Sequence, residues 1–219
     1  MTANGQVVIV DYGMGNVLSV ARAVEHCGGE PELTADRSAI AGARRIILPG
    51  VGAFRDGMRG LAARNLVEPL RDYAGQGRPM LGICLGMQML FDESEEFGRH
   101  EGLGVIPGRV EAIAGTAADG TPHKLPHIAW TPLELPEGAP NGWWEDSILD
   151  TIPVGTAAYF LHSFTAVPSD ERHRLADAHY NGRRISAAVR NGPVMGTQFH
   201  PEKSAALGLR MLRQFMELN

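Results

Sequence analysis

The chain has 219 residues, of which 44% are apolar and 21% charged, as expected of a globular protein with a substantial core. A formal net charge of −5 and the absence of a long basic run argue against non-specific binding of nucleic acid. No stretch approaches the ~18 apolar residues of a membrane span and the N-terminus lacks the pattern of a secretion signal, so we expect a cytoplasmic protein.

The first part of the chain predicts alternating strands and helices. Residues 6–11 form a continuous apolar run, which is typical of a buried parallel strand. Apolar residues then recur at helical spacing from Val17 to Val24, and Asn16 can cap the start of this helix. Residues 31–34 can form a second strand, so an α/β fold is indicated.

A Gly-x-Gly sequence, Gly13 and Gly15, follows the first strand. Such a pair can bind the phosphates of a dinucleotide, but Leu18 occupies the position of the third glycine. A lone Gly-x-Gly is a weak signal, so we interpret it as a structural loop and expect no cofactor.

A third strand, residues 44–48, leads into a second glycine-containing loop with Gly50, Val51 and Gly52. Glycines after a strand permit backbone conformations closed to other residues, so an N–H group can turn toward a substrate oxygen. An ordinary strand-to-helix connection is the alternative. The carboxyl ends of parallel strands gather such loops at one edge of a sheet, which favours a role beside any nucleophile there.

Helices are expected over residues 56–64 and 66–76, and a short apolar run after them ends at Cys84. Gly82 and Gly86 stand two residues to either side, and a helical pattern follows to about residue 91. This is the pattern of a nucleophile elbow, in which a reactive side chain sits on a tight turn between strand and helix. The glycines remove Cβ atoms that would collide in so sharp a turn.

Cys84 is therefore the candidate nucleophile, although most free cysteines are buried core residues and Cys84 alone fits both roles. The other cysteine, Cys27, falls at a helix end and we expect it to be structural. Two cysteines give no disulfide framework, and the histidines lack metal-ligand spacing, so no metal site is predicted.

From residue 102 onward the pattern changes to short alternating strands at 105–106 and 109–113, followed by a strand over 155–166. Asn-Gly pairs at 181–182 and 191–192 predict hairpins, so an antiparallel extension of the sheet is expected. The acidic run at 92–96 is interpreted as a solvated face. The final helix carries apolar residues on one face: Leu207, Met211, Phe215 and Leu218. No linker divides residues 1–219, which predicts a single domain.

A candidate base lies near the C-terminus, where His200 and Glu202 flank Pro201. On an extended segment the two side chains can lie on one side, so the histidine can accept a thiol proton while the glutamate orients its ring. A solvated loop histidine is the alternative. Together with Cys84, however, the motif resembles the class I, or triad, glutamine amidotransferases, in which cysteine, histidine and glutamate follow in this order.

Further blocks narrow the resemblance. They are Asp11–Asn16, Pro49–Phe54, Gly82–Gln88, Lys124–Trp130 and Gly196–Ser204. In this order they resemble the family of glutaminase subunits of imidazole glycerol phosphate synthase, over nearly the whole chain. The family implies a flavodoxin-like, doubly wound, mostly parallel sheet with an antiparallel extension. It also implies a heterodimer with a (β/α)8-barrel cyclase subunit that receives the ammonia.

The resemblance also implies roles for individual residues. Backbone N–H groups of Leu85 and of the loop with Gly50, Val51 and Gly52 would stabilise an oxyanion. The side chain of Gln88 would help to hold the substrate glutamine. The same role is implied for a segment near the middle of the chain: His162, Ser163 and Phe164.

Two departures from the family pattern stand out. In the usual Pro-His-Met-Gly-Trp-Asn sequence, methionine, glycine and asparagine are replaced here by Ile128, Ala129 and Thr131. The usual tyrosine of His-Ser/Thr-Tyr is replaced by Phe164. The second change removes a hydroxyl group. Partner contacts are expected from Lys124–Trp130 and from Lys203, with Trp130 either an interface anchor or a core aromatic.

Other functions remain to be distinguished. The same glutaminase chemistry serves other synthases, such as those of anthranilate and guanylate, but the block at residues 11–16 argues against them. A non-catalytic module on this fold, a cysteine peptidase and a γ-glutamyl hydrolase are further alternatives. Glutaminase assays with and without a cyclase would separate them.

Overall fold

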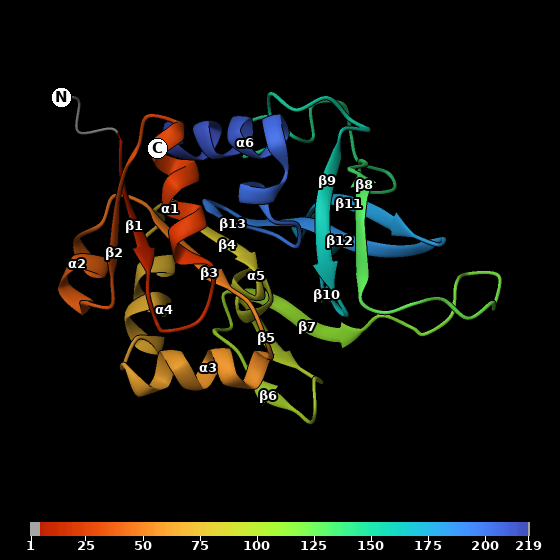
Figure 1. Ribbon diagram of the computed structural model, residues 1–219, viewed down its shortest axis with the longest axis horizontal. Helices are drawn as coiled ribbons and strands as arrows, with labels where there is room; N and C mark the ends of the chain where they lie inside the picture. Colours follow the sequence, from red (N-terminus) through yellow and green to blue (C-terminus); the bar gives the residue numbers. More distant parts are fainter. Residues whose placement is uncertain (1–4, 219) are drawn as a thin grey trace.

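The computed structural model describes residues 5–218 and is built around a seven-stranded sheet in the order β11-β12-β13-β4-β3-β1-β2 (Figure 1). Five neighbouring strands of this sheet are parallel: β2 (Glu30–Thr34), β1 (Gln6–Val10), β3 (Ile46–Gly50), β4 (Met80–Cys84) and β13 (Val194–Thr197). The remaining two, β12 (Arg183–Asn191) and β11 (Arg174–Tyr180), extend it in antiparallel fashion. The expected mixed sheet is confirmed.

Helices cover both faces of the sheet, as Figure 1 shows. One face carries α1 (Val17–His26) and α6 (Ala205–Glu217). The other carries α2 (Arg37–Gly42), α3 (Phe54–Ala63), α4 (Val67–Gly75) and α5 (Leu85–Met89). Because the helices that connect parallel strands lie on both faces, with α1 on one and α2 to α4 on the other, the arrangement is doubly wound.

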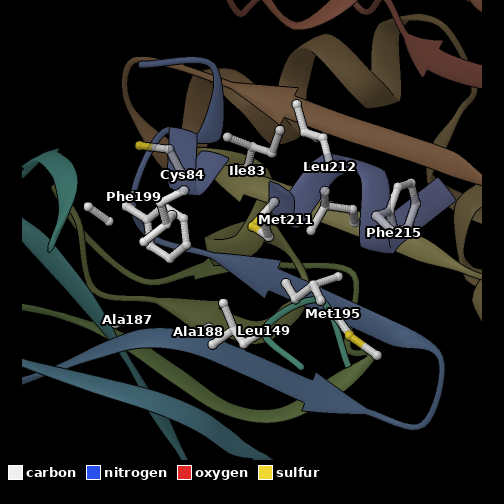
Figure 2. Packing of buried hydrophobic residues seen from close by; sticks show 14 of the residues in the cluster. Ile83, Cys84, Leu149, Ala187, Ala188, Met195, Phe199, Met211, Leu212 and Phe215 are labelled. Carbon is white, nitrogen blue, oxygen red and sulfur yellow. The ribbon is translucent and has the colours of Figure 1, made fainter. Parts of the chain in front are cut away.

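Alternation along the central strands separates the two cores. Val7 and Ile9 of β1 join the cluster under α1 and α6, whereas Val8 and Val10 join the cluster under α3 to α5. Figure 2 shows the first cluster, with Cys84 at its margin beside the buried ring of Phe199. The catalytic candidates thus stand on a rigid, close-packed base.

Two smaller sheets lie beside the main one. A four-stranded sheet has the order β10-β7-β5-β6, with β5 (Phe91–Ser94), β6 (His100–Glu101), β7 (Ile106–Ala112) and β10 (Phe164–Pro168). A two-stranded ribbon pairs β8 (His127–Pro132) with β9 (Ala157–His162). Two 3₁₀ turns, η1 (Glu171–His173) and η2 (Pro201–Lys203), complete the structure.

Three local expectations were wrong. The helix after Cys84 ends at Met89, because residues 91–94 pair with β7 as strand β5. The single strand expected over 155–166 is interrupted at Ser163, so that its two halves belong to different sheets. The helix α1 begins at the expected place, but the side chain of Asn16 makes no capping hydrogen bond.

Among the described residues no helix is long and apolar enough to cross a membrane. The expected turn at Asn181 and Gly182 is confirmed, with φ angles of 49° and 77° that suit a tight hairpin.

Candidate active site

Three of the sequence motifs meet at the carboxyl ends of the parallel strands. Gly50, the last residue of β3, lies in register with Cys84, the last residue of β4. On the other side of β4, Thr197 of β13 pairs with Ile83, so the segment that leads to His200 leaves the sheet beside Cys84. The sheet order itself brings these distant parts of the chain to one place.

Cys84 stands on a strained turn. Its φ of 53° lies in a region that residues with a side chain rarely adopt, and such outliers collect at functional sites. A Cβ atom on Gly86 would lie 1.8 Å from the carbonyl oxygen of Leu48, and one on Gly82 would lie 2.7 Å from the backbone nitrogen of Met87. The predicted elbow is therefore confirmed, and both glycines are needed for its close packing.

His200 and Glu202 form a buried pair. The Nδ1 atom of His200 lies 2.9 Å from Oε1 of Glu202, and the two side chains are only 4% and 2% exposed. Burial alone lowers the pKa of His200, but hydrogen bonds and charge interactions with Cys84 and Glu202 outweigh it and raise the pKa to about 9. Because Nδ1 is taken by Glu202, Nε2 is the nitrogen left for the sulfur.

The loop that carries His200 is fixed from two sides. The hydroxyl of Ser204 donates to the carbonyl oxygen of His200 over 2.7 Å and accepts from the backbone N–H of Tyr159. Behind η2, helix α6 approaches so closely that a Cβ atom on Gly208 would lie 1.8 Å from the carbonyl oxygen of Pro201. The position of the histidine ring is thus set by the packing of the last helix.

The loop after β3 packs directly against the elbow. A Cβ atom on Gly50 would lie 2.5 Å from the hydroxyl of Tyr12 and 3.0 Å from the backbone nitrogen of Gly86, so only glycine fits. Gly52 adopts a φ of 100°, and Val51 between the two glycines is partly exposed. Close approach at one glycine and a left-handed backbone at the other are what the sequence pattern required.

A cavity of about 330 Å³ opens beside Cys84. The predicted residues that line it are Val51, Gly52, Cys84, Leu85, Gln88, His162, Ser163, Phe164, His200 and Lys203. Gly50 lies beneath the loop and Glu202 behind His200, so neither lines the cavity. Nearly all of the residues singled out from sequence therefore surround a single space.

Gln88 and His162 share one backbone acceptor. Nε2 of Gln88 donates to the carbonyl oxygen of Phe164 over 3.2 Å, and Nδ1 of His162 lies 2.7 Å from the same oxygen. Phe164 takes part in this contact through its backbone carbonyl. Phenylalanine in place of the usual tyrosine therefore does not affect the contact.

Both ring nitrogens of His162 are occupied. A carbonyl oxygen only accepts, so Nδ1 of His162 donates to Phe164 and its Nε2 accepts from Nδ1 of His127 over 3.0 Å. His127 in turn accepts at Nε2 from the hydroxyl of Thr131 over 2.9 Å. Burial lowers the pKa of His162 to about 3 and that of His127 to about 4, which keeps both rings neutral.

The ring of His162 consequently has no nitrogen left for a substrate, and its part in the site is to support the Phe164 carbonyl. Thr131, one of the departures from the family pattern, supplies the hydroxyl that completes this chain of hydrogen bonds.

Sequence reasoning missed three cavity-lining residues from the stretch after the elbow and from β9. They are Glu96, Phe97 and Leu161. Glu96 was expected in a solvated face, but it is buried and its Oε2 accepts from the backbone N–H of Phe54 over 2.6 Å. Phe97 beside it is 79% exposed with a φ of 53°. The acidic run gave no signal that one of its members turns inward.

A larger, more open hollow of about 560 Å³ lies elsewhere, around Arg71 and Asn191. Arg71 donates to the carbonyl oxygens of Gly102 and Leu103, and Asn191 donates to that of Val105. These polar groups already have partners, so chemistry favours the smaller cavity. Within residues 5–218 no cluster of His, Cys, Asp or Glu side chains could hold a metal ion.

Comparison with known proteins places these features in context. The glutamine amidotransferase class-I family matches residues 8–218. The imidazole glycerol phosphate synthase subunit HisH 1 of Legionella pneumophila (strain Lens) is 47% identical over 212 residues, which cover 97% of this chain and 99% of that protein. Subunit HisH of Syntrophotalea carbinolica is 46% identical over 213 residues, covering 97% of this chain and 100% of that protein.

Solved structures agree on the fold. A crystal structure of a glutamine amidotransferase superposes with a TM-score of 0.70 at 21% identity, over 96% of this chain and 97% of the other. PurLQS from Thermotoga maritima gives 0.67 at 22% identity, over 96% of this chain and 94% of the other. The flavodoxin-like arrangement expected from sequence is thereby confirmed.

Proposed function

The chain belongs to the class-I glutamine amidotransferases and, within them, to the HisH subunits of imidazole glycerol phosphate synthase, and from this premise we propose how its residues act. It hydrolyses glutamine to glutamate and ammonia for histidine biosynthesis. The observation that carries the proposed mechanism is the buried His200–Glu202 pair, aimed at a strained cysteine beside a cavity. We assign Cys84 as nucleophile, His200 as acid and base, and Glu202 as the group that orients the imidazole.

The reaction proceeds in two halves. The Cys84 thiolate attacks the side-chain amide carbon of glutamine, and the carbon–nitrogen bond breaks as protonated His200 passes its proton to the leaving nitrogen. This releases ammonia and leaves a γ-glutamyl thioester. Neutral His200 then takes a proton from water, the resulting hydroxide attacks the thioester, and glutamate leaves as the thiolate returns.

The negative charge that develops on the amide oxygen needs donors. We assign this task to the backbone N–H of Leu85, at the start of α5, and to an N–H of the loop at Gly50–Gly52. Loss of one such donor typically lowers turnover by about 10²–10³-fold. The loop glycines allow the peptide to present either its carbonyl or its N–H group, which makes this loop the natural point of control.

The ends of glutamine can be assigned from charge and hydrogen bonding. Glu96 places a carboxylate in the cavity, where it suits the α-ammonium group of the substrate. The amide nitrogen of Gln88 is committed to Phe164, so its oxygen is the atom left to accept from the substrate. Ser163 and Phe164 line the same wall.

A direct test is glutamate release by the purified chain supplied with the cyclase. Cys84→Ala is expected to abolish glutamine hydrolysis while ammonia-dependent synthesis by the partner continues. Cys27→Ala is the matched control and should retain activity, because Cys27 lies at the end of α1 and its thiol donates to the carbonyl oxygen of Leu209, away from the cavity. Loss of activity in the control and retention in Cys84→Ala would refute the assignment.

The names of the relatives indicate a partner subunit. We propose that this partner is a (β/α)8-barrel cyclase that forms a heterodimer with the chain and receives the ammonia. Free ammonia would be protonated in water and lost as a nucleophile, so a sealed route to the next site is the physical advantage of a complex.

The β8–β9 ribbon offers the surface for this partner. Ile128 pairs with Leu161 and Trp130 with Tyr159, so the apolar side chains share one side of the ribbon next to the cavity. Ile128 is 56% exposed and Trp130 53% exposed, which excludes the interpretation of Trp130 as a core residue in the free chain. Exposed apolar surface of this kind is typical of an interface.

Binding of the cyclase measured by titration tests this surface. Trp130→Ala is expected to weaken the complex by at least tenfold, as removal of an aromatic hot spot typically costs about 2 kcal/mol or more. Leu33→Ala is the control, because Leu33 is also partly exposed but lies on β2 at the opposite edge of the sheet (Figure 1). Equal affinity of Trp130→Ala and the unmodified chain would contradict the proposed face.

A further inference from the structure

The side chain of Gln198 lies directly beside the nucleophile. It is fully buried, with 0% of its surface exposed, and its Nε2 atom is 3.6 Å from Sγ of Cys84. Only Phe199, which fills the core beneath Cys84, separates it from His200 in sequence (Figure 2). Gln198 does not line the cavity and so cannot hold the substrate.

A chain of hydrogen bonds fixes which end of this amide faces the sulfur. The Phe164 carbonyl oxygen only accepts, so the nitrogen of Gln88 must point toward it over 3.2 Å. The same nitrogen lies 3.0 Å from Oε1 of Gln198. The oxygen of Gln198 therefore faces Gln88, and its N–H group faces Cys84. One backbone carbonyl sets the direction of both amides.

The surroundings of the sulfur otherwise favour a neutral thiol. Cys84 is only 8% exposed, and the backbone carbonyl of Leu161 lies 4.0 Å from Sγ, where it can accept from an S–H group but not from a thiolate. Burial in apolar surroundings disfavours the charged sulfur, whereas a hydrogen-bond donor favours it. Apart from the imidazole of His200, the amide of Gln198 is the side-chain donor that the described residues direct at this atom.

We propose that Gln198 is a positioning residue for the glutaminase reaction, whose amide N–H holds Cys84 as a thiolate and whose direction is set by Gln88. The donor carries no charge, so it stabilises the sulfur without competing for the proton that His200 must move. The proposal rests on the proposed role of Cys84 as nucleophile.

The test measures alkylation of Cys84 by iodoacetamide as a function of pH, followed at this residue by peptide mass analysis. Gln198→Met keeps the size of the side chain but removes the donor. At pH 7 its alkylation is expected to be about tenfold slower than in the unmodified chain, the ratio typical of one hydrogen bond to a charged group. The difference between the two rates should narrow as the pH is raised, since hydroxide in the medium then deprotonates the thiol without help from a donor.

Two further variants separate this role from a merely structural one. Gln198→Glu replaces the donor with an acceptor of the same shape and should slow alkylation at pH 7 more than Gln198→Met does. Gln88→Met frees the Gln198 amide to rotate and should slow alkylation less than Gln198→Met does. The Gln88→Met, Gln198→Met double variant should be no slower than Gln198→Met alone. Gln214→Met, at a half-buried position near the end of α6, is the control for the substitution itself.

Alkylation of folded Gln198→Met or Gln198→Glu with the rate and pH dependence of the unmodified chain would overturn the proposal, whatever their thermal stability. Should Gln198→Met not fold, Gln88→Met and Gln198→Glu decide by the same readout. The measurement needs no glutamine and no partner. A chain that fails to hydrolyse glutamine therefore refutes the proposed function, while an unchanged alkylation profile refutes only the role of Gln198.

Discussion

Two histidines face the same cavity from different parts of the molecule, and their chemistry is opposite. Burial lowers the pKa of both His200, on the segment after β13, and His162, at the end of β9. His200 has the carboxylate of Glu202 and the sulfur of Cys84 as neighbours, and its pKa rises to about 9. For His162, burial outweighs the hydrogen bond to the Phe164 carbonyl, the two neighbouring histidines His127 and His200 act in the same direction as burial, and the pKa falls to about 3.

The difference shows that burial alone keeps a histidine neutral, and that a buried histidine carries a proton only where negatively charged neighbours outweigh its burial. The segment at β13 and η2 is built to move a proton. The ribbon of β8 and β9 is built to keep its rings neutral and to present a surface outward. A sequence reader sees two histidines at strand ends and cannot tell the two roles apart.

The largest effect is expected from breaking the charged region, by which we mean His200, Glu202 and Cys84. In the complex with the cyclase, His200→Asn should lower glutaminase turnover by about 10³-fold or more, because no group remains to move the proton. Cys84→Ala should be as severe, and the double variant should be no worse than either, since the residues act as a unit. Steady-state glutamate release measures all three. Near-normal turnover of His200→Asn would end the proposed mechanism.

The partner should act on neither histidine region but on the loop between them. The His200–Glu202 hydrogen bond already exists in the free chain, so the element left to complete is the oxyanion loop at Gly50–Gly52. Glutamate release by the isolated chain should be slow and should rise by at least about 10²-fold only with cyclase and its ligand, the typical value of one oxyanion donor. Equal rates for the isolated chain, the chain with cyclase, and the chain with cyclase and its ligand would contradict the proposal that the partner controls this loop.

A smaller effect is expected from weakening the charged region without destroying it. Glu202→Gln keeps the hydrogen bond to His200 but removes the charge that raises the pKa of the imidazole. Turnover should fall less than in His200→Asn, and the pH dependence of kcat/KM should move to lower pH. A pH profile unchanged from that of the unmodified enzyme would show that Glu202 does not set the protonation of His200.

The smallest effect concerns the neutral region, by which we mean His127 and His162, and it is a change in the free energy of unfolding with pH. The folded-state pKa values of His127 and His162 lie below the unfolded value of 6.5. The unfolded chain therefore binds more protons below pH 6.5, and these sites lose stability as pH falls from 6.5 toward 4, by at most about 1.4 kcal/mol per pH unit for each histidine. His200 has the opposite sign, since its contribution is present below pH 6.5 and is lost as pH rises through about 9.

Urea unfolding at pH 6.5, 5.5 and 4.5 measures this slope. His127→Phe should flatten it, because one of the two neutral histidines is gone, whereas His26→Gln at the exposed end of α1 should not change it. The same slope in His127→Phe and in the unmodified chain would show that His127 titrates normally in the folded protein.

Much of the charged region could be predicted from the sequence because its constraints are local. The elbow can be recognised from glycines at fixed offsets from Cys84. The base and its orienting acid can be recognised from the two-residue spacing of His200 and Glu202. The sheet that unites them followed from apolar runs that alternate with helical patterns. These signals depend on neighbours within a few positions.

Other contacts around the site could not be predicted because they join distant parts of the chain and follow irregular patterns. The break at Ser163 splits one apparent strand between two sheets, and Glu96 turns inward from an acidic run to accept from the backbone N–H of Phe54. The amide of Gln198 reads as part of a motif, and its contact with Cys84 spans 114 positions of the chain. Only the folded arrangement shows such pairs.

The close approach of Gly208 to the carbonyl of Pro201 has a consequence for protein engineering. Replacing a mid-helix glycine with alanine is a standard way to stabilise a protein, by up to about 1 kcal/mol. Here the added methyl group would push α6 away from η2 and carry His200 with it. A library ranked by helix propensity would therefore place near its top a substitution that trades catalytic rate for an apparent gain in robustness.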